Sequence, residues 1–187
     1  MNKEQDYYHS LYQVAKVINS SLEPTQVLET IAGQVIQSMD IKACSLRLLD
    51  SQAQHLIMGA SQGLSQGYLR KGTVQVSKSG LDQEALQGKK AVQVQDARTD
   101  PRFQYPEQAR DEGLVSLLVL PLMVEDRPIG VIRAYSGEYR EFTEEEIEFL
   151  HIIANLSAIA LENAMLHQRL KLNCQLQEDY DYRLFED

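Results

Sequence analysis

The chain has 187 residues, which is within the usual size of one globular domain. Hydrophobic residues make up 43% of it, enough for a single core built from a sheet and helices. Lys and Arg number 18 against 27 Asp and Glu, giving a net charge of -9. Because so acidic a chain is repelled by phosphate backbones and anionic lipid surfaces, we expect neither nucleic acid nor a membrane as its partner.

The sequence also predicts a cytoplasmic protein. No segment approaches the roughly 18 consecutive apolar residues of a membrane span, and residues 1–13 lack the apolar centre of a secretory signal. Cys44 lies in an apolar strand pattern and Cys174 in a late polar helix, so the two form no disulfide or metal motif. The four histidines are scattered, and we therefore predict no metal site; the residues identify no particular cofactor.

Two helices are expected at the start of the chain. Apolar side chains recur every three or four residues over 7–22, which makes a narrow helical seam typical of a coiled coil. Pro24 suits the first turn of a second helix, whose apolar positions continue to Met39.

Strands then alternate with short helices. Residues 43–49 and 54–60 read as a hairpin, and residues 64–69 hold one or two helical turns. Val74 and Val76 indicate a short strand, and Ser79 with Asp82 resembles a capping box for a helix that Gly88 ends. Residues 91–96 alternate as another strand.

The rest of the chain predicts a short helix, a hairpin and a long helix. Pro106 opens a helix that ends at Gly113, and residues 114–124 and 129–135 flank a tight polar turn. Thr143 and Glu146 form a capping box at the start of a helix that has no Gly or Pro before the last residue. The fold class is therefore α+β: an antiparallel sheet of about six strands with helices packed on one side, and long N- and C-terminal helices.

At this point the sequence resembles the GAF domain family over residues 20–170. The matching segments come in the family's order: 60–64 after the second strand, 96–103 beside the ligand pocket, 112–122 and 127–132 in the final hairpin, and 142–154 in the closing helix. The resemblance implies a pocket between the sheet and its small helices, and a role in signalling. It names no ligand, because one fold holds many.

Several specialised members of that family depart from this sequence. The Asn-Lys, Phe and Asp-Glu set of cyclic-nucleotide binders is not found, and the chain lacks the pocket cysteines of bilin-binding and redox-active relatives. His55 opens a strand and His151 lies on the closing helix, so neither is a good haem ligand. Residues 59–63 match the G-x-S-x-G nucleophile elbow, but Ser61 lacks the expected partners. We therefore predict no catalytic residue.

The resemblance and the polar residues suggest a ligand site. Arg133 interrupts an apolar strand, so it faces either solvent or an anion in a pocket. Asp96, Asp100, Asp111 and Glu112 are read mainly as turn and cap residues. The predicted ligand-binding residues are Met58, Tyr68, Leu81, Ala85, Val94, Phe103, Ser116 and Arg133.

The closing helix predicts a dimer because it is apolar on two faces. One face, from Leu150 to Ala164, suits packing on the domain itself. The other begins at Phe149 and needs a partner, as does the N-terminal seam, so a four-helix bundle of two chains follows. The predicted interface comprises Leu11, Ile18, Ile152, Leu156, Ile159, Asn163, Leu166 and Leu170.

These predictions divide the chain into an N-terminal dimerisation helix (1–22), a GAF-like sensory domain (23–168) and a C-terminal helical extension (169–187). The expected function is a non-enzymatic sensory module of a prokaryotic signalling system. It binds a small molecule, acts as a homodimer and passes its signal to a separate output protein. One alternative is a purely structural dimerisation module without a ligand, and another is a small hydrolase that uses Ser61.

Overall fold

The structure, a computed structural model, describes residues 3–20 and 23–184, with side chains for 5–19, 23–167 and 170. Leu22 of the predicted seam lies outside these residues. The helices are α1 (Lys3–Ser20), α2 (Pro24–Met39), α3 (Gln66–Leu69), α4 (Gly80–Gly88), α5 (Pro106–Glu112) and α6 (Glu144–Leu184), with a 3-10 turn η1 (Val76–Lys78). The strands are β1 (Ala43–Leu49), β2 (His55–Gln62), β3 (Val74–Gln75), β4 (Val92–Val94), β5 (Leu117–Val124) and β6 (Arg127–Tyr135).

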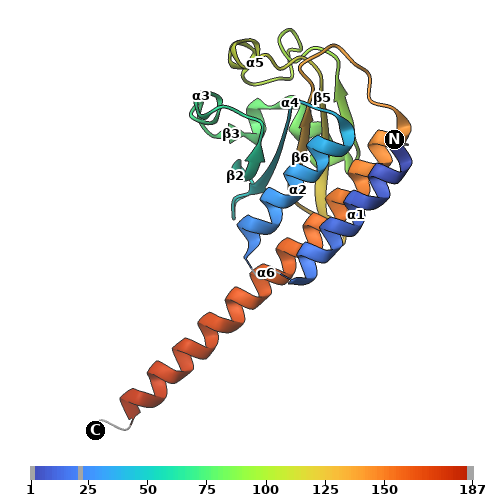
Figure 1. Ribbon diagram of the computed structural model, residues 1–187. Helices are drawn as coiled ribbons and strands as arrows, with labels where there is room; N and C mark the ends of the chain where they lie inside the picture. Colours follow the sequence, from blue (N-terminus) through green and yellow to red (C-terminus); the bar gives the residue numbers. More distant parts are fainter. Residues whose placement is uncertain (1–2, 21–22, 185–187) are drawn as a thin grey trace.

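All six strands form one antiparallel sheet with the order β3-β2-β1-β6-β5-β4 (Figure 1). Strand β1 lies at the centre, paired with β2 on one side and β6 on the other. The β5–β6 hairpin turns at Glu125 and Asp126, and Glu125 takes a positive φ of 51°. The predicted α+β fold with a six-stranded antiparallel sheet is confirmed. The prediction that its helices pack on one side is wrong, because short helices also cover the second face of the sheet.

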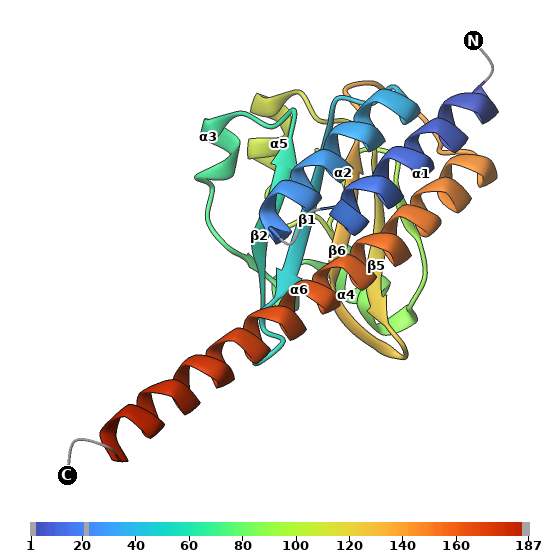
Figure 2. The same ribbon diagram turned by 60° about the horizontal axis from the view of Figure 1, so that its bottom comes forward.

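The two faces of the sheet carry different layers. The long helices α1, α2 and α6 cover one face, whereas the short helices α3, α4 and α5 lie over the other (Figures 1 and 2). Because neighbouring residues of a strand point to opposite faces, each strand feeds two cores. On β1, for example, Cys44 and Leu46 join the core under the long helices, and Ala43 joins the core under the short ones.

The capping box at the start of α6 is confirmed. The Glu146 backbone N–H donates to Thr143 Oγ1 at 3.3 Å, and the Thr143 N–H donates to Glu146 Oε2 at 3.1 Å. These reciprocal bonds satisfy two donors that a helix N-terminus otherwise leaves unpaired. The helix then runs alongside α1, and its second half extends away from the domain (Figure 2).

The inward face of α6 is also confirmed, with one correction. Its predicted members are all buried: Leu150, Ala154, Ser157, Leu161 and Ala164. Phe149, predicted to open the outward face, is only 3% exposed and stacks on Tyr7 with ring centroids 4.3 Å apart. The reason is that α1 packs beside α6 and widens the buried arc of that helix.

One helical segment, Glu144–His167, is long and apolar enough to cross a membrane by length and composition alone. In the structure 44% of its most apolar window is buried inside the domain. Core helices of globular proteins have the same composition, so this segment is weak evidence for a membrane span.

One local prediction was wrong in detail: Val76, predicted to continue the strand of Val74, lies instead in η1. The helix predicted to end at Gly88 does end there, and the following residue, Lys89, takes the left-handed cap conformation with φ 50°.

Candidate functional site

The face of the sheet beneath the short helices brings together most of the predicted ligand-site residues. Tyr68, Leu81, Ala85, Val94 and Phe103 belong to one buried apolar cluster. Arg133 is 2% exposed on the same face, between the cluster members Val131 and Tyr135 of β6. Met58 is half-buried on β2, directly opposite Arg47 of β1.

Ser116 is a buried member of the predicted set with a different role. Its hydroxyl donates to the Gln95 carbonyl at 2.8 Å and to the Glu138 carbonyl at 3.1 Å, and it accepts the Arg140 N–H at 2.9 Å. These backbone bonds occupy the hydroxyl and hold the segment that leads into α6.

Arg133 faces neither solvent nor an open pocket: it forms a buried ion pair with Asp82 of α4. Arg133 Nε donates to Asp82 Oδ1 at 2.9 Å, and a second guanidinium nitrogen contacts Oδ2. Asp82 is fully buried. Burial alone lowers the pKa of Arg133, but the charge of Asp82 and the hydroxyl of Tyr135 outweigh it and hold that pKa above its ordinary value. Arg133 is therefore a permanent buried cation.

Asp82 is a residue whose role the sequence concealed. The spacing Ser79–Asp82 predicted a capping box, yet Ser79 makes no side-chain bond to a backbone N–H. Its hydroxyl donates to the Asp82 carboxylate instead. The same carboxylate faces the sheet because α4 packs on β5 and β6. Tertiary packing therefore brings Asp82 into contact with Arg133.

Arg47 of β1 is a second buried guanidinium on this face. It is 3% exposed, and its Nε has no hydrogen-bond partner among the described residues. Burial, followed by the neighbouring charge of Arg133, lowers the pKa of Arg47. A charged residue inside the apolar strand 43–49 was the sequence signal for it, the same signal that pointed to Arg133 on β6.

Lys71 and Tyr68 complete the polar cluster. Lys71 Nζ lies 3.2 Å from the centroid of the Tyr68 ring, a cation–π contact. The Tyr68 ring meets the Tyr135 ring edge-on, with centroids 6.4 Å apart. Tyr135 in turn shares a hydrogen bond of 3.2 Å with Ser45 through its hydroxyl. Burial, and then the charges of Arg47 and Arg133, lower the pKa of Lys71 to about 6.

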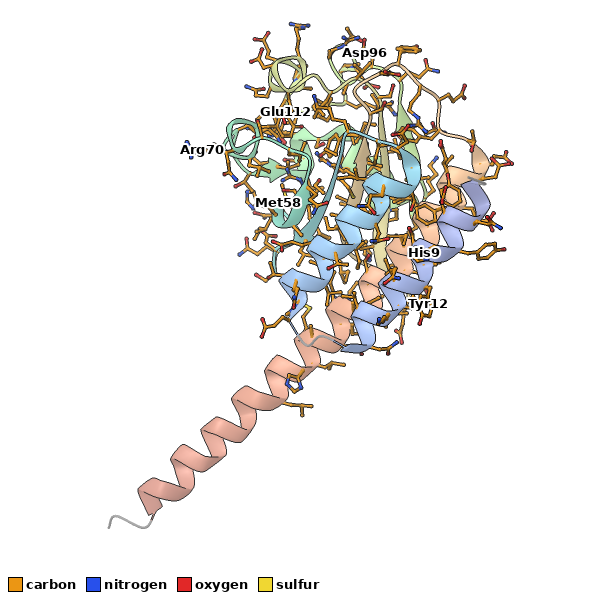
Figure 3. The ribbon with its side chains drawn as sticks, viewed as in Figure 1. His9, Tyr12, Met58, Arg70, Asp96 and Glu112 are labelled. Carbon is orange, nitrogen blue, oxygen red and sulfur yellow. The ribbon has the colours of Figure 1, made fainter. Side chains whose placement is uncertain are left out.

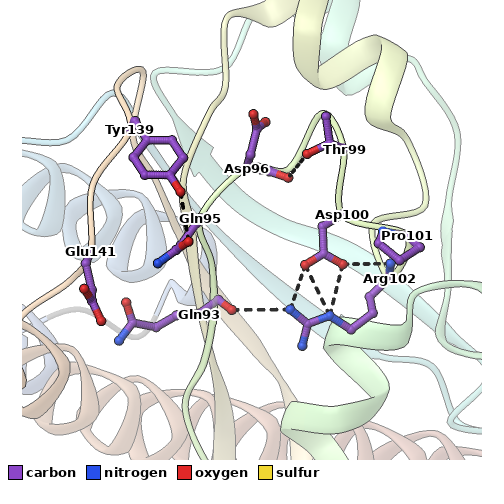
Figure 4. A pocket seen from close by; sticks show the side chains of 9 residues that line it. All are labelled: Gln93, Gln95, Asp96, Thr99, Asp100, Pro101, Arg102, Tyr139 and Glu141. Carbon is purple, nitrogen blue, oxygen red and sulfur yellow. Dashed lines mark hydrogen bonds and ion pairs between the residues drawn. The ribbon is translucent and has the colours of Figure 1, made fainter.

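A hollow, separate from this buried cluster, lies at the surface between β4 and the start of α6. Its volume is about 500 Å³, and Figure 4 shows its lining residues Gln93, Gln95, Asp96, Thr99, Asp100, Pro101, Arg102, Tyr139 and Glu141. Arg102 pairs with Asp100 at 2.7 Å and with Glu84 at 2.8 Å, and Asp96 pairs with Arg98. Asp96 and Asp100 act as turn residues here, as expected. The positive charge of Arg102 in this hollow is already neutralised by Asp100 and Glu84.

Ser61 lies in strand β2, opposite Ser45 of β1. A nucleophile elbow requires a sharp turn between a strand and a helix. The local geometry of Ser61 therefore does not match that motif.

The cysteine with a described side chain, Cys44, is separated from the cluster by the sheet. It is buried in the core under the long helices, and burial raises the pKa of its thiol. Such a thiol stays protonated and inert. Among the described residues, no group of three His, Cys, Asp or Glu side chains is arranged to hold a metal ion.

The fold is an α+β domain with an antiparallel sheet, and comparison with protein families gives its family. A GAF domain family matches residues 21–162, which is most of the chain. The chain therefore belongs to the GAF domain family.

The relatives of this chain include regulatory proteins. The formate hydrogenlyase transcriptional activator of Salmonella typhimurium is 23% identical over 172 residues, covering 90% of this chain and 25% of the activator. The chain thus spans about a quarter of the length of the curated relatives it first matches.

Solved structures show the same fold. The GAF domain of the Acinetobacter phosphoenolpyruvate-protein phosphotransferase is 25% identical with a TM-score of 0.74, covering 89% of this chain and 97% of that one. The free methionine-R-sulfoxide reductase of Neisseria meningitidis, solved with its substrate, is 20% identical with a TM-score of 0.73, covering 89% and 95% of the two chains. This chain is a GAF domain of the kind found in signalling and regulatory proteins.

Proposed function

We propose that this chain is a non-enzymatic sensory module of a cytoplasmic, prokaryotic-type signalling system. It binds a small molecule on the sheet face beneath α3 and α4, and it passes the signal through helices that pair two copies of the chain. A separate output protein receives that signal, as it does in many modular sensors.

The observation that carries this proposal is the position of α6. Its inward face packs on β5 and β6, the strands that also face α4 and its Asp82 across the sheet. Its outward face carries exposed apolar side chains that the domain leaves uncovered. A change at the site can therefore reach an exposed surface through one rigid helix.

The outward surface, which we call the α6 stripe, is apolar over five helical turns. Ile152 is 40% exposed, Ile159 52%, Leu166 50% and Leu170 64%. Tyr8 and Tyr12 of α1 are also exposed, at 66% and 65%, and Figure 3 shows Tyr12 on the outer side of that helix. A second copy of the chain would bury both surfaces in a four-helix bundle.

Not every predicted interface residue is equally suited to this bundle. Asn163 is exposed and lies within the α6 stripe, between Ile159 and Leu166, where a polar residue in the shared seam sets the register of the two helices. Leu11, Ile18 and Leu156 are partly buried and already pack on the core of their own chain. Their substitution would disturb folding as well as pairing, so they are poor test positions.

The test is the dissociation constant of the dimer by sedimentation equilibrium, in wild type and in Ile159→Glu. Because the substitution puts two charges into the shared seam, we expect at least a tenfold weaker dimer with an unchanged circular dichroism spectrum. Gln87→Glu, an exposed change on α4 across the sheet, is the matched control. A wild type that is monomeric at micromolar concentration would refute the dimer mechanism.

A structural dimerisation module without a ligand is the second candidate. Complete burial of Leu81, Ala85 and Arg133 favours it, because a filled core can explain these residues without any small molecule. Native mass spectrometry of the purified protein separates the two candidates. A retained small molecule supports the sensor, and an empty dimer whose dissociation constant responds to no added ligand supports the structural module.

A further inference from the structure

The sheet face beneath the short helices holds more positive than negative charge. Arg47 comes from β1, Arg133 from β6 and Lys71 from the segment between α3 and β3. Asp82 pairs with Arg133, whereas no carboxylate of the described residues forms an ion pair with Arg47 or Lys71. Lys71, whose pKa is lowered to about 6, can lose its proton, whereas the guanidinium of Arg47 has no such option. Burying that guanidinium without a counter-charge is costly, so its position needs an explanation.

The same place holds three donors without acceptors. Arg47 Nε, Lys71 Nζ and the Tyr68 hydroxyl are buried and have no hydrogen-bond partner in the described part of the chain. Most buried polar groups in folded proteins are paired, and isolated exceptions are few. Arg47 and Tyr68 are both only 3% exposed, so bulk water does not supply the missing hydrogen-bond acceptors.

These donors converge because of the sheet register. Ser45 lies opposite Arg133 and Arg47 lies opposite Val131, which makes the two arginines diagonal neighbours on one face. The ring of Tyr68 comes down from α3 against Tyr135 on the same face. Lys71 Nζ sits over that ring, so all three unpaired donors border one region.

No nearby carboxylate is free to fill this region. Glu112, the other acid near Lys71, accepts the Ser65 N–H at 2.6 Å and also contacts the Ser65 hydroxyl. Figure 3 places Glu112 among the short helices. Its carboxylate therefore fastens α5 to the start of α3 and leaves Arg47 unpaired.

We propose that this face binds a small anion, a carboxylate or comparable oxyanion, through Arg47, Lys71 and Tyr68. The inference rests on the proposed sensory function, since it names the ligand class of that site. Donor-only side chains select a ligand rich in acceptors, and a guanidinium fits a carboxylate with two parallel bonds. The three guanidinium nitrogens of Arg133 already donate to Asp82 and Tyr135, so Arg133 borders the site as a fixed, paired guanidinium. Leu56, Leu81 and Val131 belong to the same buried cluster, so the proposed ligand has few atoms.

The route to the site runs past Lys71. This residue is half-buried between the exposed residues Arg70 and Gly72, whereas Arg47 lies beneath it on the sheet. Gly72 has a φ of 108°, a conformation that a side chain would strain. Glycine at position 72 therefore permits the backbone turn that follows Lys71 at the rim of the site.

The experiment measures anion binding by the chain of residues 1–187. Sodium formate, acetate and inorganic phosphate are titrated by calorimetry, with sodium chloride at equal ionic strength as the blank. We expect saturable binding of at least one of the three and a matching rise in Tm. Arg47→Met should weaken that binding by roughly 10- to 100-fold, the loss expected for one charge-assisted hydrogen bond.

Two variants separate binding from folding. Arg70→Met removes a nearby exposed arginine and should leave the affinity within about twofold of wild type. Tyr68→Phe removes only a hydroxyl and should weaken binding while the ring contacts persist. Arg47→Met without ligand should have an equal or higher Tm, because an unpaired buried charge is lost. A lower Tm for unliganded Arg47→Met would contradict the claim that Arg47 lacks a partner.

The outcomes distinguish this inference from the proposed function. If none of the three anions binds saturably, the anion inference is overturned, even where native mass spectrometry finds a neutral ligand that preserves the sensory function. If an anion binds and the dimer dissociation constant does not respond, the anion site stands and the proposed transmission through α6 fails. Equal affinity in wild type and Arg47→Met also overturns the inference.

Discussion

The Arg133–Asp82 pair gives a sharp prediction about stability. Asp82→Asn keeps the shape of the side chain and removes its charge, so that the guanidinium of Arg133, 2% exposed, loses its counter-ion. Breaking a buried ion pair by removing one partner costs about 3–5 kcal/mol. Since each kcal/mol shifts Tm by about 2–4 °C in a chain of this size, we expect Tm to fall by roughly 6–20 °C.

The assay is urea unfolding followed by circular dichroism, with a double-mutant cycle. Arg133→Met alone leaves the carboxylate of Asp82 buried with only the Ser79 hydroxyl as a partner, so it should also be destabilising. The cycle consists of Asp82→Leu alone, Arg133→Met alone and the double variant Asp82→Leu with Arg133→Met, which replaces both charges by apolar groups. The double variant should recover most of the loss, because apolar replacement of a whole buried pair is often neutral.

The coupling between the two positions decides the outcome. We expect a coupling energy above about 2 kcal/mol, within the range for residues that share one network. A cost below about 1 kcal/mol for Asp82→Asn, or single effects that simply add, would refute the claim that this pair holds α4 on the sheet.

Three further predictions follow from particular contacts. Thr143→Ala removes the cap of α6 and should lower the free energy of unfolding by about 1 kcal/mol in urea titrations, whereas no change would mean that Glu146 alone secures the helix start. The pKa of Lys71 is about 6 when folded and 10.5 in its ordinary state, so between these values the unfolded chain binds the extra proton and stability should rise with pH. The difference in stability between wild type and Lys71→Met, measured from pH 6 to 9, should therefore shrink as pH rises, and a constant difference would contradict this prediction. The charged groups on neighbouring elements that set the pKa of Lys71 are Arg47, Arg133, Glu112 and Asp82. Ser61→Ala should leave any hydrolysis of a p-nitrophenyl ester unchanged, and a clear loss in a folded variant would revive the hydrolase alternative.

Local signals in the sequence determined the elements of this protein. The capping box of Thr143 and Glu146, Pro24 at the start of α2, and Gly113 after α5 each act over three or four residues, so the pattern alone located those helix ends. Apolar runs bounded by polar turn residues likewise predicted β1, β5 and β6. The period of the inward face of α6 identified five of its buried side chains but not Phe149, Ile153 and Ala158.

The partners of the charged residues were decided only by the tertiary structure. Asp82 is 51 positions from Arg133 in the chain, and no local rule distinguishes it from a capping residue. Arg47 and Arg133 become neighbours through the pairing of β1 with β6, and Lys71 and Tyr68 reach them only when the short helices close over that face. The prediction that Phe149 lies on the outward face of α6 was wrong for the same reason. The helical period of α6 does not predict that α1 packs beside this residue. A sequence shows which residues are charged or apolar, but burial and pairing depend on contacts between elements far apart in the chain.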